Sequence, residues 1–431
     1  MSGKSNRSAR GAVEVPDRLG RAATGTRIAP APIILRARRR DRAHRRRRRR
    51  ARAIALVGIC TLALVGMLAL ETLASAIDDG IASSDDGAVA SAPIISDTGD
   101  ALSRAVAFEG TLELPVAGAT GYAGTSELLR SEATLDAAAV ATLDPGSAFT
   151  IREERDGWWR VRTPAGAEGW VHSEGCFINL PDVIPSIVYD DTNAYDSRFT
   201  VAGTAIPGVT DSTLYVARRH NARLGGDAFD MAVLYPMAER ICAAQRAALA
   251  DGYTLVIYEG FRPYDVQVQV AQAVQELMRT DAAARVAVST PPWSIDWFIA
   301  TRLSNHQQGY AIDTSLARVT ASEERVAGGY RYTRVTGYVE LAMPTGVHEL
   351  GSAAAALSRP VSVMSDAAWR QVPAAAGMNE AARLLQSYAT DAGLTPLASE
   401  WWHFNDLASA SVVDDGYTGR FTLAANVSEA P

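Results

Sequence analysis

Cysteine and histidine are scarce in this sequence, because its 431 residues include only three cysteines and six histidines, and thiol and imidazole ligands are therefore few. Cys60 lies inside an apolar run, so at most one disulfide is available beyond it, and we predict that this disulfide joins Cys176 and Cys242. No internal repeat is visible. Two of the histidines lie in the N-terminal half, so a metal site in the C-terminal half depends on the other four. These four are His220, His306, His348 and His403.

Formal charge is distributed unevenly along the chain. The net charge is -6, yet residues 1–52 carry 18 lysines and arginines against three acidic residues, which gives +15 there and leaves -21 for the remainder. Residues 53–70 contain no charge, and about 18–20 apolar residues suffice to cross a hydrocarbon core of roughly 30 Å. By the positive-inside rule we predict a basic cytoplasmic tail (1–52), a single transmembrane anchor (53–76) and an extracytoplasmic remainder at the cell membrane.

The N-terminal region also allows other interpretations. A signal peptide cleaved after Ala76 would explain the apolar run, although 52 residues make a long basic leader. The arginines of residues 36–52 have no aromatic residues among them, which favours a topology signal in contact with anionic lipid over nucleic-acid binding. Residues 77–105 are rich in Asp, Gly and Ser and poor in large apolar side chains, and they predict a flexible linker.

Residues 106–181 contain short β-type runs separated by turns, which is typical of a small all-β barrel. The runs lie at 148–151, 158–162 and 169–171. The stretch DPGSAFTIREERDGWWRVRTPAGAEGWV resembles the second half of bacterial SH3-like domains. Such domains commonly bind cell-wall peptides. Trp158, Trp159 and Trp170 would then offer a stacking surface, or else they form the core of the barrel.

The remaining residues, 182–431, mix helical and strand patterns. Residues 237–249 and 265–278 have the apolar spacing of amphipathic helices, while residues 255–258 and 338–343 predict strands. This combination indicates an α+β domain.

Two short segments of this domain supply the side chains of a hydrolytic metal site. The first reads SNHQQGYAID and contains His306 and Asp313, and the second reads EWWH and contains Glu400 and His403. A zinc hydrolase usually has three protein ligands, an open position for water, and a carboxylate base beside that water. Two imidazoles and two carboxylates fill these roles.

The two segments resemble the zinc D,D-peptidases that include the vancomycin-resistance D-Ala-D-Ala dipeptidases and D,D-carboxypeptidases. The family pattern is Ser-x-His-x-x-Gly-x-Ala-x-Asp followed downstream by Glu-x-Trp-His. The resemblance implies a hedgehog/DD-peptidase-like fold, Zn²⁺ bound by His306, Asp313 and His403, and Glu400 as general base. It also implies that Arg262, in the segment EGFRPY, assists catalysis.

The resemblance further implies a substrate, either the D-Ala-D-Ala dipeptide or the same pair at the end of a peptidoglycan stem peptide. We expect Ser304, Tyr310 and Trp402 to contact it. Of Trp401 and Trp402, one should face the site while the other packs behind it. His220 and His348 are interpreted as solvated or structural residues.

The chain departs from the dipeptidase pattern between the two zinc motifs. Dipeptidase relatives carry Asp-Met-Gly-Thr followed by Phe-Asp there, whereas residues 342–349 read AMPTGVHE. An acidic group that helps those enzymes to recognise the free amine is missing, and Glu340 or Glu349 could replace it. The alternatives are therefore an enzyme acting on longer stem peptides, a wall endopeptidase of different bond specificity, and a non-catalytic wall-binding protein.

Overall fold

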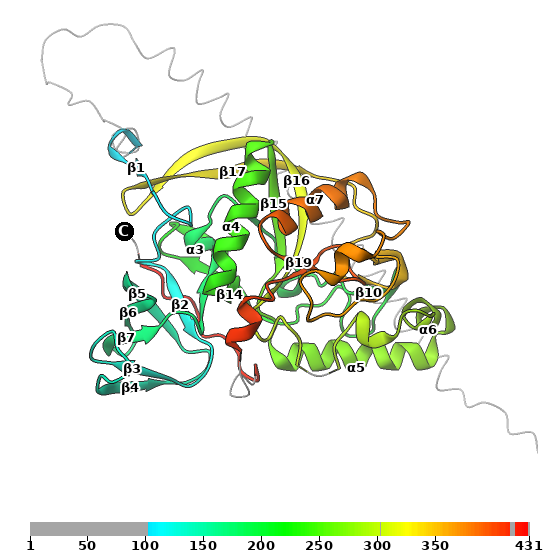
Figure 1. Cartoon of the computed structure of the whole chain (residues 1–431), viewed down its shortest axis with the longest axis horizontal. Helices are drawn as coiled ribbons and strands as arrows, with labels where there is room; N and C mark the ends of the chain where they lie inside the picture. The colour runs from blue at the N-terminus through cyan, green and yellow to red at the C-terminus, as the bar shows by residue number, and fades with distance from the viewer. Residues whose placement is uncertain (1–101, 302, 414–418, 430–431) are drawn as a thin grey trace, which may run out of the picture. The chain divides into compact units, whose positions relative to one another are not determined.

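The computed structural model describes residues 102–301, 303–413 and 419–429 (Figure 1). The predicted basic tail, transmembrane anchor and nearly all of the linker lie outside these residues. Among the residues that are described, no helix is long and apolar enough to span a bilayer. The described chain forms a β-barrel followed by an α+β region.

The barrel is an antiparallel sheet in the order β14-β8-β2-β5-β6-β7-β3-β4. Its strands are β2 (Thr120–Ala123), β3 (Glu127–Arg130), β4 (Ala139–Leu143), β5 (Ala148–Arg155), β6 (Trp158–Arg162), β7 (Glu168–His172), β8 (Cys176–Asn179) and β14 (Ala232–Leu234). The three β-type runs seen in the sequence are confirmed as β5, β6 and β7. Phe149, Ile151, Trp159, Val161 and Val171 of these strands belong to the hydrophobic core.

The three tryptophans of the barrel are buried. Trp159 is fully covered and donates from Nε1 to Glu154 at 3.0 Å. Trp158 packs edge-on against His172, and the guanidinium of Arg155 covers the ring of Trp170 at 4.5 Å. Their positions favour the interpretation as core residues over an open stacking surface.

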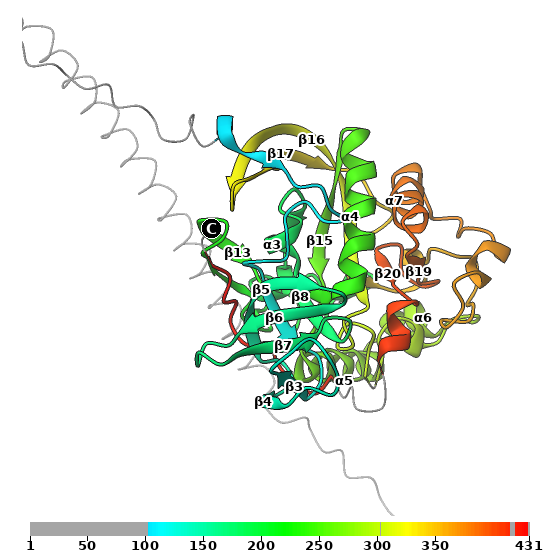
Figure 2. The ribbon, with the colours of Figure 1, turned by 60° about the vertical axis from the view of Figure 1, so that its left-hand side comes forward.

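The C-terminal residues 419–429, which we call the C-terminal strap, run along the barrel (Figure 2). Thr150 donates from Oγ1 to the carbonyl of Val427 at 2.7 Å, and Arg152 forms an ion pair with Glu429. The barrel sheet is also extended by β14, a strand more than 50 residues further along the chain than β8. The barrel is thus joined to the α+β region at two places.

The α+β region contains a seven-stranded sheet with the order β1-β17-β16-β15-β9, to which β20 and β19 add beside β16. Its strands are β1 (Val106–Ala107), β9 (Val188–Tyr189), β15 (Tyr253–Glu259), β16 (Ala311–Ala327), β17 (Tyr330–Glu340), β19 (Thr395–Pro396) and β20 (His403–Asn405). Short pairs form apart from this sheet: β10 (Thr200–Val201) with β11 (Thr204–Ala205) and β18 (Glu349–Leu350), and β12 (Arg218–Asn221) with β13 (Gly226–Phe229).

The helices bury one apolar face each against this sheet or against one another. They are α3 (Leu180–Val183), α4 (Tyr235–Ala250), α5 (Tyr264–Thr280), α6 (Ala282–Ser289) and α7 (Glu380–Asp391). The structure confirms the two predicted amphipathic helices as α4 and α5. On α5 the buried Val266, Val270 and Val274 recur at four-residue spacing, as an amphipathic helix requires.

The predicted strand at 338–343 is partly wrong, since β17 ends at Glu340. Leu341 still donates its N–H to the carbonyl of Leu316 at 2.9 Å, but Pro344 has no N–H with which to continue a ladder. The chain therefore leaves the sheet here and turns toward the cleft described below.

The predicted disulfide is also wrong, because Cys176 and Cys242 are both free and buried. The Cys176 thiol lies on β8 and donates to the carbonyl of His172 at 3.3 Å. Cys242 lies on α4, where burial raises the pKa of its thiol to about 12, an effect that the nearby Glu113 reinforces. The two thiols are thus buried on different elements, β8 and α4, and are not bonded to each other.

Candidate metal centre

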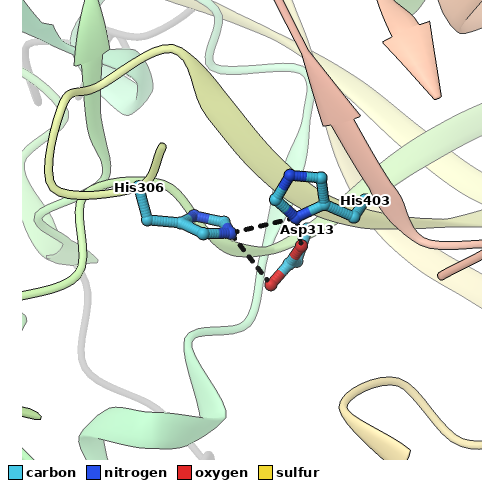
Figure 3. A group of neighbouring side chains, drawn as sticks. All are labelled: His306, Asp313 and His403. Carbon is cyan, nitrogen blue, oxygen red and sulfur yellow. Dashed lines mark hydrogen bonds and ion pairs between the residues drawn. The ribbon is translucent and has the colours of Figure 1, made fainter. Parts of the chain in front are cut away.

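The predicted ligands come from one turn and two paired strands (Figure 3). His306 lies in the turn that precedes β16, and Gly309, at a φ of +76°, adopts the left-handed conformation that this turn needs. Asp313 lies on β16 directly opposite His403 of β20, because the two strands pair in an antiparallel register. Residues 90 positions apart in the sequence are thereby neighbours.

The ligand atoms converge on one point. His306 Nε2 lies 3.1 Å from His403 Nδ1 and 3.4 Å from Asp313 Oδ2, and His403 Nδ1 lies 2.9 Å from Asp313 Oδ1. All three side chains are buried, and their ligand atoms lie within 4.8 Å of one another. Two imidazoles and a carboxylate at this spacing fit a divalent transition metal such as zinc.

The other ring nitrogen of each histidine is held by an oxygen acceptor. His306 Nδ1 lies 2.8 Å from the carbonyl of Gly260, and His403 Nε2 lies 3.1 Å from Oδ1 of Asn405. Because both partners accept only, the ring proton resides on these nitrogens, and the opposite nitrogens present lone pairs to the metal position. The tautomers needed for metal binding are therefore set by the fold.

Asp313 is surrounded by cationic and imidazole groups. Burial alone would raise its pKa, but His306, His348 and His403 together hold the pKa of this carboxyl well below its usual range. Asp313 is thus a carboxylate at neutral pH, as a metal ligand must be.

His348 is the residue that sequence reasoning placed least well. It is buried, its Nε2 lies 2.9 Å from Asp313 Oδ2, and its ring stacks on Phe199 at 4.3 Å. Its backbone has a φ of +62°, a strained conformation for a residue other than glycine. The interpretation of His348 as structural misses its contact with a metal ligand, whereas His220 is 68% exposed, as expected for a solvated residue.

Glu259, Asp313 and His348 also lie close enough together to hold a cation. Glu259 is already occupied, however, since both of its oxygens accept hydrogen bonds from Arg262 and one also accepts from Asn193. This group is therefore a network that supports the metal ligands.

Arg262 lines the cleft with most of its donors engaged. Nε and Nη2 donate to Glu259, Nη2 also reaches Asp313 at 3.5 Å, and Nη1 donates to Gln267 at 2.7 Å. Burial disfavours the charge, but Glu259 and Asp313 keep the pKa of Arg262 above its usual range. Among the described residues these bonds use four of the five N–H groups, which leaves one N–H of Nη1 without a partner there.

Glu400 is buried beside the ligands, with Oε2 3.7 Å from His403 Nδ1. Burial and then the charge of Asp313 raise the pKa of Glu400 well above its usual range. A divalent cation between these groups would lower that pKa, because an adjacent positive charge favours the carboxylate. The carboxyl thus lies beside the predicted ligands, and a buried carboxyl with a shifted pKa in a cleft is a candidate for proton transfer.

A cleft of about 230 Å³ opens onto these residues. Its lining includes His306, Asp313, His403, Glu400, Arg262, Ser304, Trp402, His348, Phe199, Phe298, Leu303, Val363 and Asp296. The hydroxyl of Ser304 is buried without a hydrogen-bond partner among the described residues, which leaves it available to a substrate.

Trp401 and Trp402 lie in a turn just before β20, not on a strand. Trp402 lines the cleft, while Trp401 packs behind it and donates from Nε1 to Thr345 at 3.0 Å. Tyr310 is not among the residues that line the cleft, although its hydroxyl donates at 2.7 Å to Asn305, which does line it. No direct contact between Tyr310 and a substrate is expected from this position.

The two glutamates considered as replacements for the missing acidic group also lie outside the cleft. Glu340 accepts a hydrogen bond from the hydroxyl of Tyr258 at 2.8 Å, and Glu349 lies beside the backbone of Gly346. Asp296 is the exposed carboxylate at the cleft. Nothing in its local sequence distinguishes it from other acidic residues.

The chain was compared with protein families, curated proteins and solved structures. Residues 127–175 match the bacterial SH3 domain family, which confirms the predicted SH3-like module. No curated protein matches the chain. A solved structure of VanYB in complex with D-alanine-D-alanine is 16% identical, covers 51% of this chain and 91% of its own, and has a TM-score of 0.23. A second structure is that of a mutant of the vancomycin resistance D,D-pentapeptidase VanY, from a VanB-type resistance cassette, in complex with Zn(II). It is 16% identical, covers 52% of this chain and 93% of its own, and has a TM-score of 0.21.

Proposed function

We propose that this protein is a zinc-dependent peptidase that hydrolyses the bond between two D-alanines at the end of a peptide. The observation that carries the proposal is the convergence of His306 Nε2, His403 Nδ1 and the Asp313 carboxylate beside a second buried carboxyl, Glu400. The three ligands and the base lie in the order and spacing of the D,D-peptidase motifs.

The residues divide the chemistry among them. Zinc held by His306, Asp313 and His403 would supply a Lewis acid that polarises the peptide carbonyl and acidifies water. Glu400 accepts the proton of the attacking water and then passes it to the leaving amine. The free N–H of Arg262 and the hydroxyl of Ser304 hold the peptide, and Trp402 forms an apolar wall against it.

We further propose that the substrate is the acylated end of a peptidoglycan stem peptide. Recognition of a free dipeptide requires an anion for its ammonium group. In the segment that departs from the dipeptidase pattern, the residue that lines the cleft is His348, which is not a carboxylate. An acylated substrate carries a neutral amide at this place and needs no such partner. The exposed Asp296 is the group that would serve a dipeptidase instead.

The proposed site of action is the outer face of the cell membrane. The basic residues 1–52 and the charge-free run that follows support this topology. A wall substrate would then be within reach of the catalytic region.

The experiment is hydrolysis of a stem pentapeptide ending in D-Ala-D-Ala and of free D-Ala-D-Ala, each with added zinc and with chelator. Zinc-dependent release of D-alanine from the pentapeptide, with slower cleavage of the dipeptide, is expected. Preferred cleavage of the dipeptide would assign a dipeptidase. Release of other products from purified muropeptides would assign an endopeptidase, and no cleavage by zinc-loaded protein would indicate a wall-binding protein.

A further inference from the structure

The SH3-like barrel lies against the backbone of the metal site. The ring of Phe177, on β8, occupies the space beside Gly309, and a Cβ atom on Gly309 would overlap it. Gly309 belongs to the turn that carries His306, and its N–H donates back to the His306 carbonyl at 3.2 Å. A barrel side chain therefore touches the turn that holds a metal ligand.

The strand β14 fixes the same turn from its other end. Leu234 pairs with Phe177 in the β8–β14 ladder and donates its N–H to the carbonyl of Gly309 at 2.8 Å. Ala232, also on β14, accepts a hydrogen bond from the N–H of Phe261 at 2.9 Å. The edge of the barrel sheet thus holds both the turn of His306 and the residue that precedes Arg262.

Three aromatic rings connect these parts, and we call Phe177, Phe261 and Phe421 the aromatic triad. The ring centroids lie 5.6 Å apart for Phe177 and Phe261, 5.3 Å for Phe261 and Phe421, and 6.2 Å for Phe177 and Phe421. Each ring belongs to a different part of the chain: the barrel, the segment before Arg262, and the C-terminal strap.

The C-terminal strap connects the barrel to the metal-site turn a second time. Gly419 lies so close to Leu303 and Gln307 that a Cβ atom on it would overlap both side chains. Gln307 in turn donates to the carbonyl of Arg262 at 3.0 Å and accepts from the N–H of Ser304 at 2.7 Å. From this turn the strap continues along the barrel to Glu429, which pairs with Arg152.

We propose that the SH3-like barrel is a positioning element of the metal centre, and that Phe177 and Phe421 act through Gly309 and Phe261 to set the positions of His306 and Arg262. Metal affinity depends on holding ligands in a fixed geometry, and residues behind the ligands typically contribute 10–100-fold. The barrel is then part of the catalytic apparatus, in contrast to a module that only tethers an enzyme to its substrate. This inference rests on the proposed metal site but not on the identity of the peptide that is cleaved.

The test compares three full-length variants, Phe177→Leu, Phe421→Leu and, as a control, Phe149→Leu. Phe149 is as deeply buried in the same barrel as Phe177, but its ring packs on Trp159. Zinc affinity is measured by competition with a chromophoric chelator, and the urea midpoint of each variant reports its stability. Phe421 is only half-buried, so Phe421→Leu keeps the test open if Phe177→Leu does not fold.

We expect Phe177→Leu and Phe421→Leu to bind zinc about 10-fold more weakly than the wild type, while Phe149→Leu, with a similar loss of stability, stays within about 2-fold. Equal affinities in all three variants would overturn the proposal, as would a wild-type protein that binds no zinc. Failure of the proposed peptidase function is distinguishable, because a protein that binds zinc but cleaves no D-Ala-D-Ala peptide still reports the difference between these variants.

Discussion

His348 and His403 approach different oxygens of one carboxylate: His348 Nε2 lies 2.9 Å from Oδ2 of Asp313, and His403 Nδ1 lies 2.9 Å from Oδ1. The first contact holds the Asp313 carboxylate from the side of Oδ2, the oxygen that also lies 3.4 Å from His306 Nε2. Outer contacts of this kind fix a ligand before the metal arrives, which reduces the ordering needed on binding.

His348→Ala should therefore weaken zinc binding about 10-fold, because Asp313 loses the donor that orients it. The dissociation constant is measured by chelator competition. His220→Ala is the matched control, since that side chain is largely exposed and pairs only with an exposed aspartate. Equal affinities of the two variants would contradict the assigned role of His348.

Two Arg–Glu pairs with the same sequence spacing should differ in their contribution to stability. Glu259 and Arg262 are buried, whereas Glu276 and Arg279 are exposed on α5. Glu259→Gln should lower the free energy of unfolding by about 3–5 kcal/mol, because it leaves a buried guanidinium poorly compensated. Glu276→Gln should change it by less than about 1 kcal/mol. Urea unfolding measures both, and similar values would refute this reading of the Arg262 network.

Glu113 should make stability depend on pH. Burial raises the pKa of its carboxyl from 4.5 to about 7, although Ser186 donates to it through both its N–H and its hydroxyl. A raised pKa means that the folded state holds the proton more tightly than the unfolded state does. The protonated Glu113 carboxyl therefore contributes fully to the free energy of unfolding below pH 4.5, and this contribution is lost as the pH rises through about 7.

Urea unfolding of wild type and Glu113→Gln at several pH values measures this effect. The wild type should lose stability relative to the variant as the pH rises from 4.5 to about 7. Other titrating groups cancel in the comparison. A constant difference across this range would show that Glu113 does not titrate as its surroundings predict.

The thiols of Cys176 and Cys242 should remain reduced and protected. Burial raises the pKa of both, so the reactive thiolate is scarce in the folded protein. A thiol-reactive reagent should modify neither residue in the native protein and both after denaturation without reductant. Faster migration on non-reducing gels, together with no modification of Cys176 and Cys242 after denaturation, would show that the two residues form a disulfide after all.

The sequence was most informative where chemistry depends on neighbours along the chain. His306 and Asp313 belong to one turn and the strand after it, and amphipathic spacing located α4 and α5. His403 could be assigned only through the family motif, because the β16–β20 register that places it opposite Asp313 is a long-range feature. Local patterns carry no information on such a register.

Other parts of the site were inaccessible to sequence reasoning. His348 reaches Asp313 because it stacks on Phe199 and adopts a positive φ, and neither feature leaves a local signature. The contact between Phe177 and Gly309 could not be predicted for the same reason. The sequence pattern of a strand does not indicate which distant segment its side chains will contact. The pattern of residues 342–349, which include His348, was the one available signal, because this segment departs from the dipeptidase pattern that the flanking motifs resemble.

The most direct measurement compares the wild type with Glu400→Gln, recording bound zinc by elemental analysis and cleavage of a D-Ala-D-Ala pentapeptide in the same samples. Glu400 is the proposed base and not a ligand, so the variant should bind one zinc per chain as the wild type does and lose about 10²–10⁴ in rate. Zinc-loaded Glu400→Gln that cleaves the peptide as fast as the wild type would contradict the account.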